Sequence, residues 1–136
     1  MPDTLSPGLK TRKRYEIDER RTTNHQGEGL GVYATPAMVL DVEVTCNELV
    51  RPLLDEGQAT VGTRVEIDHL APTPSGAWVE VQAELVEVDD RKLAFDVVIV
   101  DAVEQVGRAK HKRFIVDTDR ARKRLGEKWK KIEAAG

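Results

Sequence analysis

The sequence predicts an α+β fold in which a curved antiparallel sheet of about five strands wraps around one long central helix, with a charged helix at the C-terminus. Two observations carry this prediction. Apolar residues repeat at helical spacing in the segment 37–54 and cover almost all of its sides, whereas from residue 58 the apolar period changes to two. In addition, 12 of the 17 valines lie between residues 61 and 116. A helix that is apolar on nearly every side needs a sheet wrapped about it.

The N-terminal third predicts one strand and a long loop. Residues 1–8 hold two prolines and a glycine, which indicates a loose leader. Residues 9–17 predict a first strand, although their alternation is weak. Residues 22–34 are rich in glycine and asparagine and predict a loop, in which the glycine-rich stretch 27–31 is expected to form a flexible flap or a place where the ligand approaches the backbone.

The central helix is expected to start at Thr35 and Pro36, because threonine can cap a helix and proline is tolerated in its first turn. Pro52 and the DEG sequence at 55–57 are expected to end it. Its valines would equally suit a strand. The helical repeat consists of Met38, Val42, Cys46, Leu49, Val50 and Leu53.

Four strands at hairpin spacing follow. In the first, an apolar face is predicted to hold Val61, Thr63, Val65, Ile67 and His69. The second, after a turn at 72–76, changes phase between residues 85 and 86, which indicates a bulge. Turns at 89–92 and 104–107 lead into the last two strands.

Residues 119–133 then predict a charged helix that Asp117 or Asp119 caps, within a basic tail that spans 119–136. Leu125, Trp129 and Ile132 would form its narrow apolar stripe.

The length of 136 residues fits a single domain, 1–136. The net charge of −3 conceals an acidic middle (residues 23–106, net −12) and a basic end (residues 107–136, net +7). The lone cysteine excludes a disulfide framework, and without an apolar signal segment a cytoplasmic location is expected. No membrane association is expected. The three histidines, His25 among them, lack the spacing of a metal site, so no metal is predicted. No cofactor is predicted either.

The stretches VYATPAMVLDVEVTC, GQATVGTRVEIDHLAPTPSG and GRAKHKRFIV resemble the fluoroacetyl-CoA thioesterase family of hotdog enzymes, over about residues 9–118. The resemblance implies that Thr35, Glu43 and His69 carry the chemistry, and that Gly62 lies near the acyl pocket. The segment before Thr35 is short and polar here, where the family's namesake has a longer, aromatic-bearing one. An acyl-CoA thioesterase with a different acyl preference is therefore expected, acting on a small or medium acyl-CoA. Hotdog sheets usually pair edge to edge, so a homodimer, possibly a tetramer, is also expected.

Each of these residues also has an ordinary structural interpretation. Thr35 is most simply a helix cap, His69 a satisfied core histidine, and Glu43 a surface or ion-paired acid. If one helix held both Thr35 and Glu43, they would lie about 12 Å apart along its axis. Either Thr35 lies on a loop that folds back, or the site is completed across a dimer interface, and we favour a site shared between two subunits.

The hypothetical mechanism assigns further binding residues. Backbone amides at the helix start, near Ala37 and Met38, would hold the developing oxyanion. Glu43 would activate water or attack the thioester, while His69 orients the nucleophile or polarises the carbonyl. Basic residues of the last strand would bind the phosphates of coenzyme A. These are Arg108, Lys110, Lys112 and Arg113.

Three alternatives stay open. The main one is a hotdog domain that binds acyl-CoA without hydrolysing it, as a sensor or carrier. A hydratase of the same architecture would need a paired aspartate and histidine, which only Asp68 and His69 supply. A nucleic-acid binder would use the basic tail, but aromatic residues make up only 4% of the chain and its middle is acidic. No nucleic-acid partner is expected.

Overall fold

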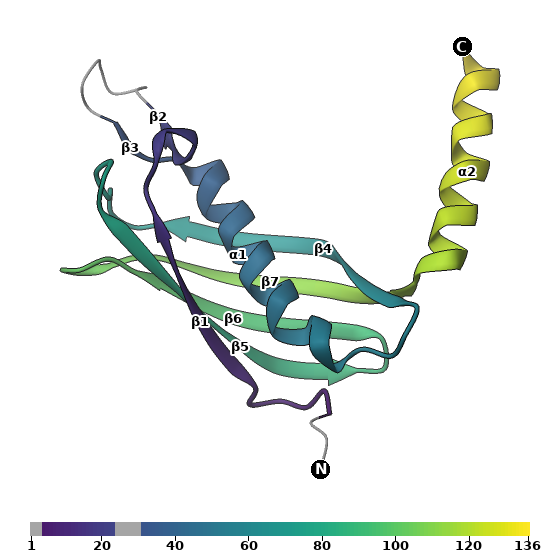
Figure 1. Cartoon of the computed structure of the whole chain (residues 1–136), viewed down its shortest axis with the longest axis horizontal. Coiled ribbons are helices and arrows are strands. Elements are labelled where there is room, and N and C mark those ends of the chain that lie inside the picture. Colours follow the sequence, from purple (N-terminus) through teal and green to yellow (C-terminus); the bar gives the residue numbers. More distant parts are fainter. Residues whose placement is uncertain (1–3, 24–30) are drawn as a thin grey trace.

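The computed structural model describes residues 4–23 and 31–136, and it confirms the predicted architecture. A five-stranded antiparallel sheet has the strand order β1-β5-β6-β7-β4, and α1 lies along one face of it (Figure 1). In chain order the elements are β1 (Lys10–Glu16), a 3-10 turn (Glu19–Arg21), β2 (Thr22–Thr23), β3 (Val32–Tyr33), α1 (Thr35–Val50), a second 3-10 turn (Arg51–Leu53), β4 (Gln58–His69), β5 (Trp78–Asp89), β6 (Lys92–Val100), β7 (Gln105–Asp117) and α2 (Thr118–Ala135).

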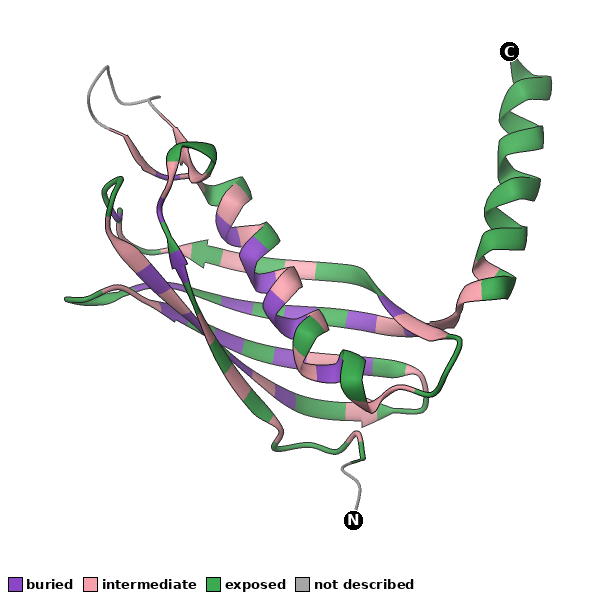
Figure 2. Cartoon of the chain, viewed as in Figure 1, coloured by how far each residue is buried: buried purple, intermediate pink, exposed green. Residues whose placement is uncertain are grey.

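The core lies between α1 and the inner face of the sheet (Figure 2). One side of α1 is fully buried there, through Met38, Val42, Cys46 and Val50. The opposite side is not covered, because Leu40 is 58% exposed. Within one chain, therefore, the sheet covers one side of the helix, and apolar surface of α1 remains open around Leu40.

The predicted apolar face of β4 is wrong in its first half. The pairing of β4 with β7 shifts register between Gly62 and Arg64, so Thr63 is an extra residue in the strand. Upstream of this bulge the two faces are exchanged: Thr60 is buried and Val61 is 45% exposed. A single inserted residue inverts every position before it, because side chains alternate with a period of two.

The other strands follow the sequence closely. A register shift between Leu85 and Glu87 confirms the predicted bulge in β5. Asp90 has φ of 55°, the left-handed conformation that the tight β5–β6 turn requires. The β6–β7 turn is earlier than expected, since β7 already begins at Gln105.

The first described residues and α2 complete the fold. Of the predicted loose leader, Leu5 packs against the core and the Gly8 amide donates to the Leu85 carbonyl at 2.8 Å. The α2 helix leaves the sheet beside the start of β4 and projects away from the body (Figure 1). Its predicted stripe is exposed, with Leu125 at 70%. Within the described residues no helix is long and apolar enough to span a membrane.

Candidate active site

Thr35 and His69, two residues that the sequence singled out, lie in direct contact. The Thr35 hydroxyl and His69 Nδ1 are 2.8 Å apart and share one hydrogen bond. Thr35 is the first residue of α1, and His69 is the last residue of β4. The expected capping role is wrong: Ala34 is the N-cap residue, and no side-chain hydrogen bond caps the helix. The hydroxyl is instead committed to the histidine.

His69 is held in a partly enclosed position that favours its neutral form. The ring packs edge-on against Tyr33, with 6.0 Å between ring centroids. Its Nε2 is buried and finds no hydrogen-bond partner among the residues that the structure describes. Burial lowers the pKa of His69, and the backbone of Ala71 partly opposes this effect. A neutral imidazole with an unused nitrogen can accept or donate a proton near pH 7.

A hollow of about 390 Å³ adjoins this pair. Thr35 and His69 line it together with Val32, Tyr33, Leu70 and other residues of the flanking segments. The segment 24–30, which contains His25 and most of the predicted glycine-rich flap, lies outside the described residues. The hollow thus opens where the two predicted catalytic side chains meet the start of α1.

The start of α1 offers one of the two expected oxyanion donors. The Met38 amide already donates to the Ala34 carbonyl at 3.0 Å. Pro36 has no N–H. The Ala37 amide has no hydrogen-bond partner within the described part of the chain. Ala37 is therefore the better-placed donor for an anionic oxygen, at the positive end of the helix dipole.

Glu43 lies in a separate group of residues near the middle of α1. A Cβ atom added to Gly62 would lie only 2.6 Å from Glu43 Oε2. Glu43 therefore rests directly against the backbone of β4, at the bulge, and a side chain at position 62 would displace its carboxylate. Its side chain is 38% exposed, so the carboxylate is accessible to water or to a ligand.

Arg113 faces Glu43 from β7. Its Nη1 lies 3.8 Å from Glu43 Oε2, which makes an ion pair without a direct hydrogen bond. The guanidinium also donates to the Thr60 hydroxyl and the Thr60 carbonyl, at 2.8 and 3.0 Å. His111 approaches the same Nη1, with its Nε2 at 3.1 Å. Glu43, Gly62, Arg113 and His111 therefore form one polar cluster beside the core.

These two groups of residues do not meet within one chain. Thr35 and Glu43 belong to the same helix, eight residues apart, which places them about 12 Å from each other along its axis. The structure brings Thr35 to His69, and Glu43 to Gly62 and Arg113. It does not bring Glu43 to the Thr35–His69 pair.

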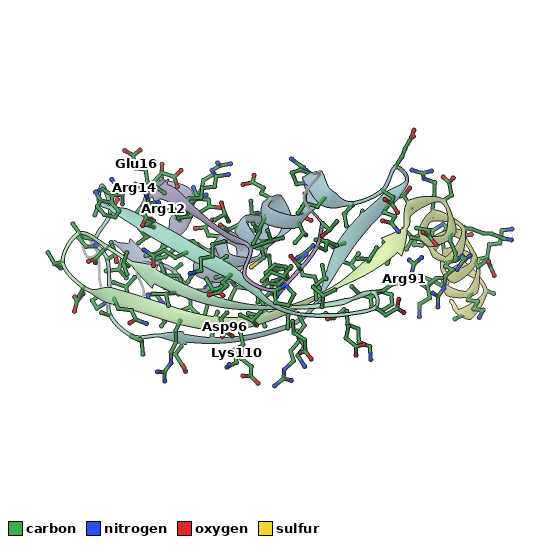
Figure 3. The ribbon with its side chains drawn as sticks, turned by 90° about the horizontal axis from the view of Figure 1, so that it is seen from below. Arg12, Arg14, Glu16, Arg91, Asp96 and Lys110 are labelled. Atoms are coloured by element: carbon green, nitrogen blue, oxygen red, sulfur yellow. The ribbon has the colours of Figure 1, made fainter. Side chains whose placement is uncertain are left out.

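The four basic residues expected to bind phosphates lie on different faces of the sheet. Arg113 is buried on the helix side of the sheet, whereas Lys110 projects from the opposite face, next to Asp96 (Figure 3). Arg108 lies on that outer face as well and pairs with Asp68 at 2.9 Å. Lys112 is exposed. Three of the four basic residues thus lie on the face away from α1.

Sequence reasoning missed the buried acid Asp41, which is only 2% exposed. It accepts two hydrogen bonds from Arg21, both at 3.1 Å, and one from the Tyr33 hydroxyl at 2.6 Å. This network ties the segment before α1 to the helix and so orients Tyr33, which packs against His69. Aspartate among apolar residues at helical spacing is the signal for such a buried ion pair.

Neither a nucleophilic cysteine nor a metal site emerges. Burial raises the pKa of the Cys46 thiol to about 12, so its thiolate is scarce near pH 7. The described residues contain no group of three side chains suited to hold a metal ion.

Comparisons with known proteins agree on the family. The family described as fluoroacetyl-CoA-specific thioesterase matches residues 17–119. Fluoroacetyl-CoA thioesterase from Streptantibioticus cattleyicolor is 33% identical over 135 residues, which span 94% of this chain and 97% of that protein. A solved structure of a fluoroacetyl-CoA thioesterase superposes with a TM-score of 0.85 at 28% identity, covering 93% of this chain and 98% of that one.

A Thermus thermophilus protein of the thioesterase superfamily shares the fold. Its TM-score is 0.82 at 24% identity, over 92% of this chain and 96% of its own. A hot-dog-like protein from Thermanaerovibrio acidaminovorans has a TM-score of 0.83 at 22% identity, over 90% and 91% of the two chains. The fold is therefore the hotdog fold, and the chain belongs to the fluoroacetyl-CoA-specific thioesterase family.

Proposed function

We propose that this protein is an acyl-CoA thioesterase that hydrolyses a small or medium acyl-CoA to the free acid and coenzyme A. The observation that carries the proposal is the Thr35–His69 hydrogen bond of 2.8 Å at the mouth of a hollow beside the start of α1. Membership of the family supports it. Coenzyme A enters as part of the substrate, and the reaction needs water but no cofactor. A cytoplasmic location remains part of the proposal.

The Thr35–His69 pair and the Glu43 cluster would carry out different parts of the reaction. The acyl carbonyl oxygen would accept a hydrogen bond from the Ala37 amide, where the helix dipole stabilises developing negative charge. Glu43 would activate water or attack the carbonyl itself, forming a transient anhydride. His69, oriented by Thr35, would position the nucleophile or polarise the carbonyl. The thiolate of coenzyme A is stable enough to leave without a strong acid.

We further propose that two subunits form each active site, because one chain separates its halves. The strand β4 is an edge of the sheet, with twelve residues available for pairing. Val61 in this strand and Leu70 just after it expose apolar side chains, as does Leu40 on α1. Antiparallel pairing of two β4 edges reverses the order of their residues. The Thr35–His69 end of one subunit would then approach the Glu43 cluster of the other.

The enzyme is tested by thiol release over a panel of acyl-CoA esters of increasing chain length. We expect turnover of short or medium chains, and Glu43→Ala and His69→Ala should each lower kcat/KM by about 100-fold or more. Glu48→Ala is the matched control: Glu48 is exposed on the same helix and, among residues 4–23 and 31–136, pairs with Lys13 alone. Turnover no faster than the buffer blank across the panel would overturn the proposal. Tight binding without thiol release would instead support a sensor or carrier.

A further inference from the structure

His111 is the one histidine of the described chain that the proposed reaction does not use, yet it lies inside the Glu43 cluster. It is 1% exposed and stacks on Phe95, with 6.0 Å between ring centroids. It belongs to β7, two residues before Arg113, so both side chains face the helix side of the sheet. A buried polar ring in such a place needs partners for both of its nitrogens.

Both nitrogens of His111 have partners, and these partners define its protonation. Nδ1 lies 2.8 Å from the Arg64 carbonyl oxygen, next to the β4 bulge. A carbonyl only accepts, so Nδ1 carries the proton. Nε2 lies 3.1 Å from Arg113 Nη1, which only donates, so Nε2 holds a lone pair. His111 is therefore neutral, in the Nδ1–H form, and acts as an acceptor toward Arg113.

This acceptor completes the restraint on the Arg113 guanidinium. Thr60 accepts from Nε and from Nη2, and His111 accepts from Nη1. Three hydrogen bonds from three different nitrogens fix the plane of the group. Nη1 itself stays 3.8 Å from the Glu43 carboxylate oxygen Oε2.

The separation of 3.8 Å has a chemical consequence. An arginine that is free to move forms short paired hydrogen bonds with a carboxylate, and these occupy the oxygen lone pairs. A carboxylate bound in that way is a weak base and a weak nucleophile. At 3.8 Å the positive charge still attracts the carboxylate, while the lone pairs remain free for water or for the acyl carbonyl.

We propose that His111 is a positioning residue that holds Arg113 back from Glu43 and so keeps the Glu43 carboxylate available for thioester hydrolysis. The inference rests on the proposed function of Glu43. The other ionisable side chain near this cluster is the buried Cys46, whose thiol stays protonated. Without the His111 acceptor, Nη1 would lose its hydrogen-bond partner, and a small shift of either side chain would then bring Glu43 Oε2, 3.8 Å away, within hydrogen-bond distance.

Two substitutions of His111 distinguish the role of its acceptor, Nε2, from the role of the rest of the imidazole ring. His111→Asn keeps an amide N–H near the Nδ1 position and loses the acceptor toward Arg113. His111→Gln places an amide oxygen near the Nε2 position and keeps that acceptor. We expect His111→Asn to lower kcat about tenfold or more with KM within about twofold of wild type, and His111→Gln to restore most of kcat. Equal kcat in both variants, whether high or low, would overturn the proposal.

A measurement on the unsubstituted protein covers the case in which the variants fail to fold. Nitrogen NMR of the imidazole rings at pH 7 should show His111 neutral, with the proton on Nδ1. A proton on Nε2, or on both nitrogens, would contradict the proposed contact with Arg113. Failure of the proposed function would look different. The wild-type protein would then release no thiol, whatever protonation the NMR spectrum shows for His111.

Discussion

Gly62→Ala tests how closely the Glu43 carboxylate is fitted to the sheet. The new Cβ would lie 2.6 Å from Glu43 Oε2, whereas ordinary contact begins at 3.4 Å. The carboxylate must therefore move by about 0.8 Å. His111 Cε1 and Arg113 Nη1, at 3.2 and 3.3 Å, must each shift by a few tenths of an ångström as well.

The expected result is a large loss of activity with little loss of stability. The closest atom is the end of a flexible side chain, and Gly62 does not have a positive φ, so the backbone accepts alanine. A misplacement of about 1 Å in a reacting group can cost about 100-fold, and we expect kcat/KM to fall between about 10- and 100-fold. The free energy of unfolding, obtained from thermal melts, should change by less than about 1 kcal/mol.

Gly126→Ala is the matched control for this substitution. Gly126 lies in the exposed helix α2, and its new Cβ would meet no atom within 4 Å. Alanine favours a helix by about 1 kcal/mol over glycine, so the control should stabilise α2 and leave kcat/KM unchanged. Steady-state thiol release and thermal melts on both variants give the comparison. Wild-type kcat/KM in a folded Gly62→Ala protein would refute the close contact with Glu43.

Two further predictions concern stability. Burial lowers the pKa of both His69 and His111, so the folded state prefers their neutral forms. Unfolded histidine titrates near pH 6.5, so this contribution to stability is present above about pH 6.5 and is lost as the pH falls below it. The Tm should drop between pH 8 and 5.5, and less so in His111→Gln; a Tm that rises over this range would contradict the assignment. Asp41→Asn removes the charge that Arg21 pairs with at 3.1 Å, and should cost about 3 kcal/mol, or a fall in Tm on the order of 10 °C. Glu48→Gln, in an exposed pair with Lys13, should cost less than about 1 kcal/mol, and equal losses in the two variants would refute the importance of burial at Asp41.

The order of elements could be predicted from the sequence because local patterns determine it. The change from a helical to a two-residue apolar period marks the end of α1, and the phase slip after Leu85 marks the β5 bulge. The β4 bulge gave no such signal, because Val61 and Thr63 continue the apolar alternation across it. The reason for a glycine at position 62 is visible only in the fold, where Glu43 of α1 approaches it closely.

The candidate site residues could be singled out from the sequence, but their arrangement into two groups could not be predicted. Thr35 fits a capping role by every local rule, and only the fold reveals that His69 takes its hydroxyl. The buried side of β7 did carry a signal that went unused: Ala109, His111, Arg113 and Ile115 alternate in phase. An arginine and a histidine on the same buried face of a strand indicate a polar cluster in the core.

The proposal that two subunits share each active site is tested most directly by mixing two inactive variants. Glu43→Ala and His69→Ala subunits are unfolded together, refolded in equal amounts, and assayed for thiol release. If each site takes His69 from one subunit and Glu43 from the other, random pairing gives mixed dimers in about half of the molecules, each with one intact site. Activity should then recover to about a quarter of the wild-type value. Activity no higher than that of the two variants assayed separately would contradict a site built from two chains.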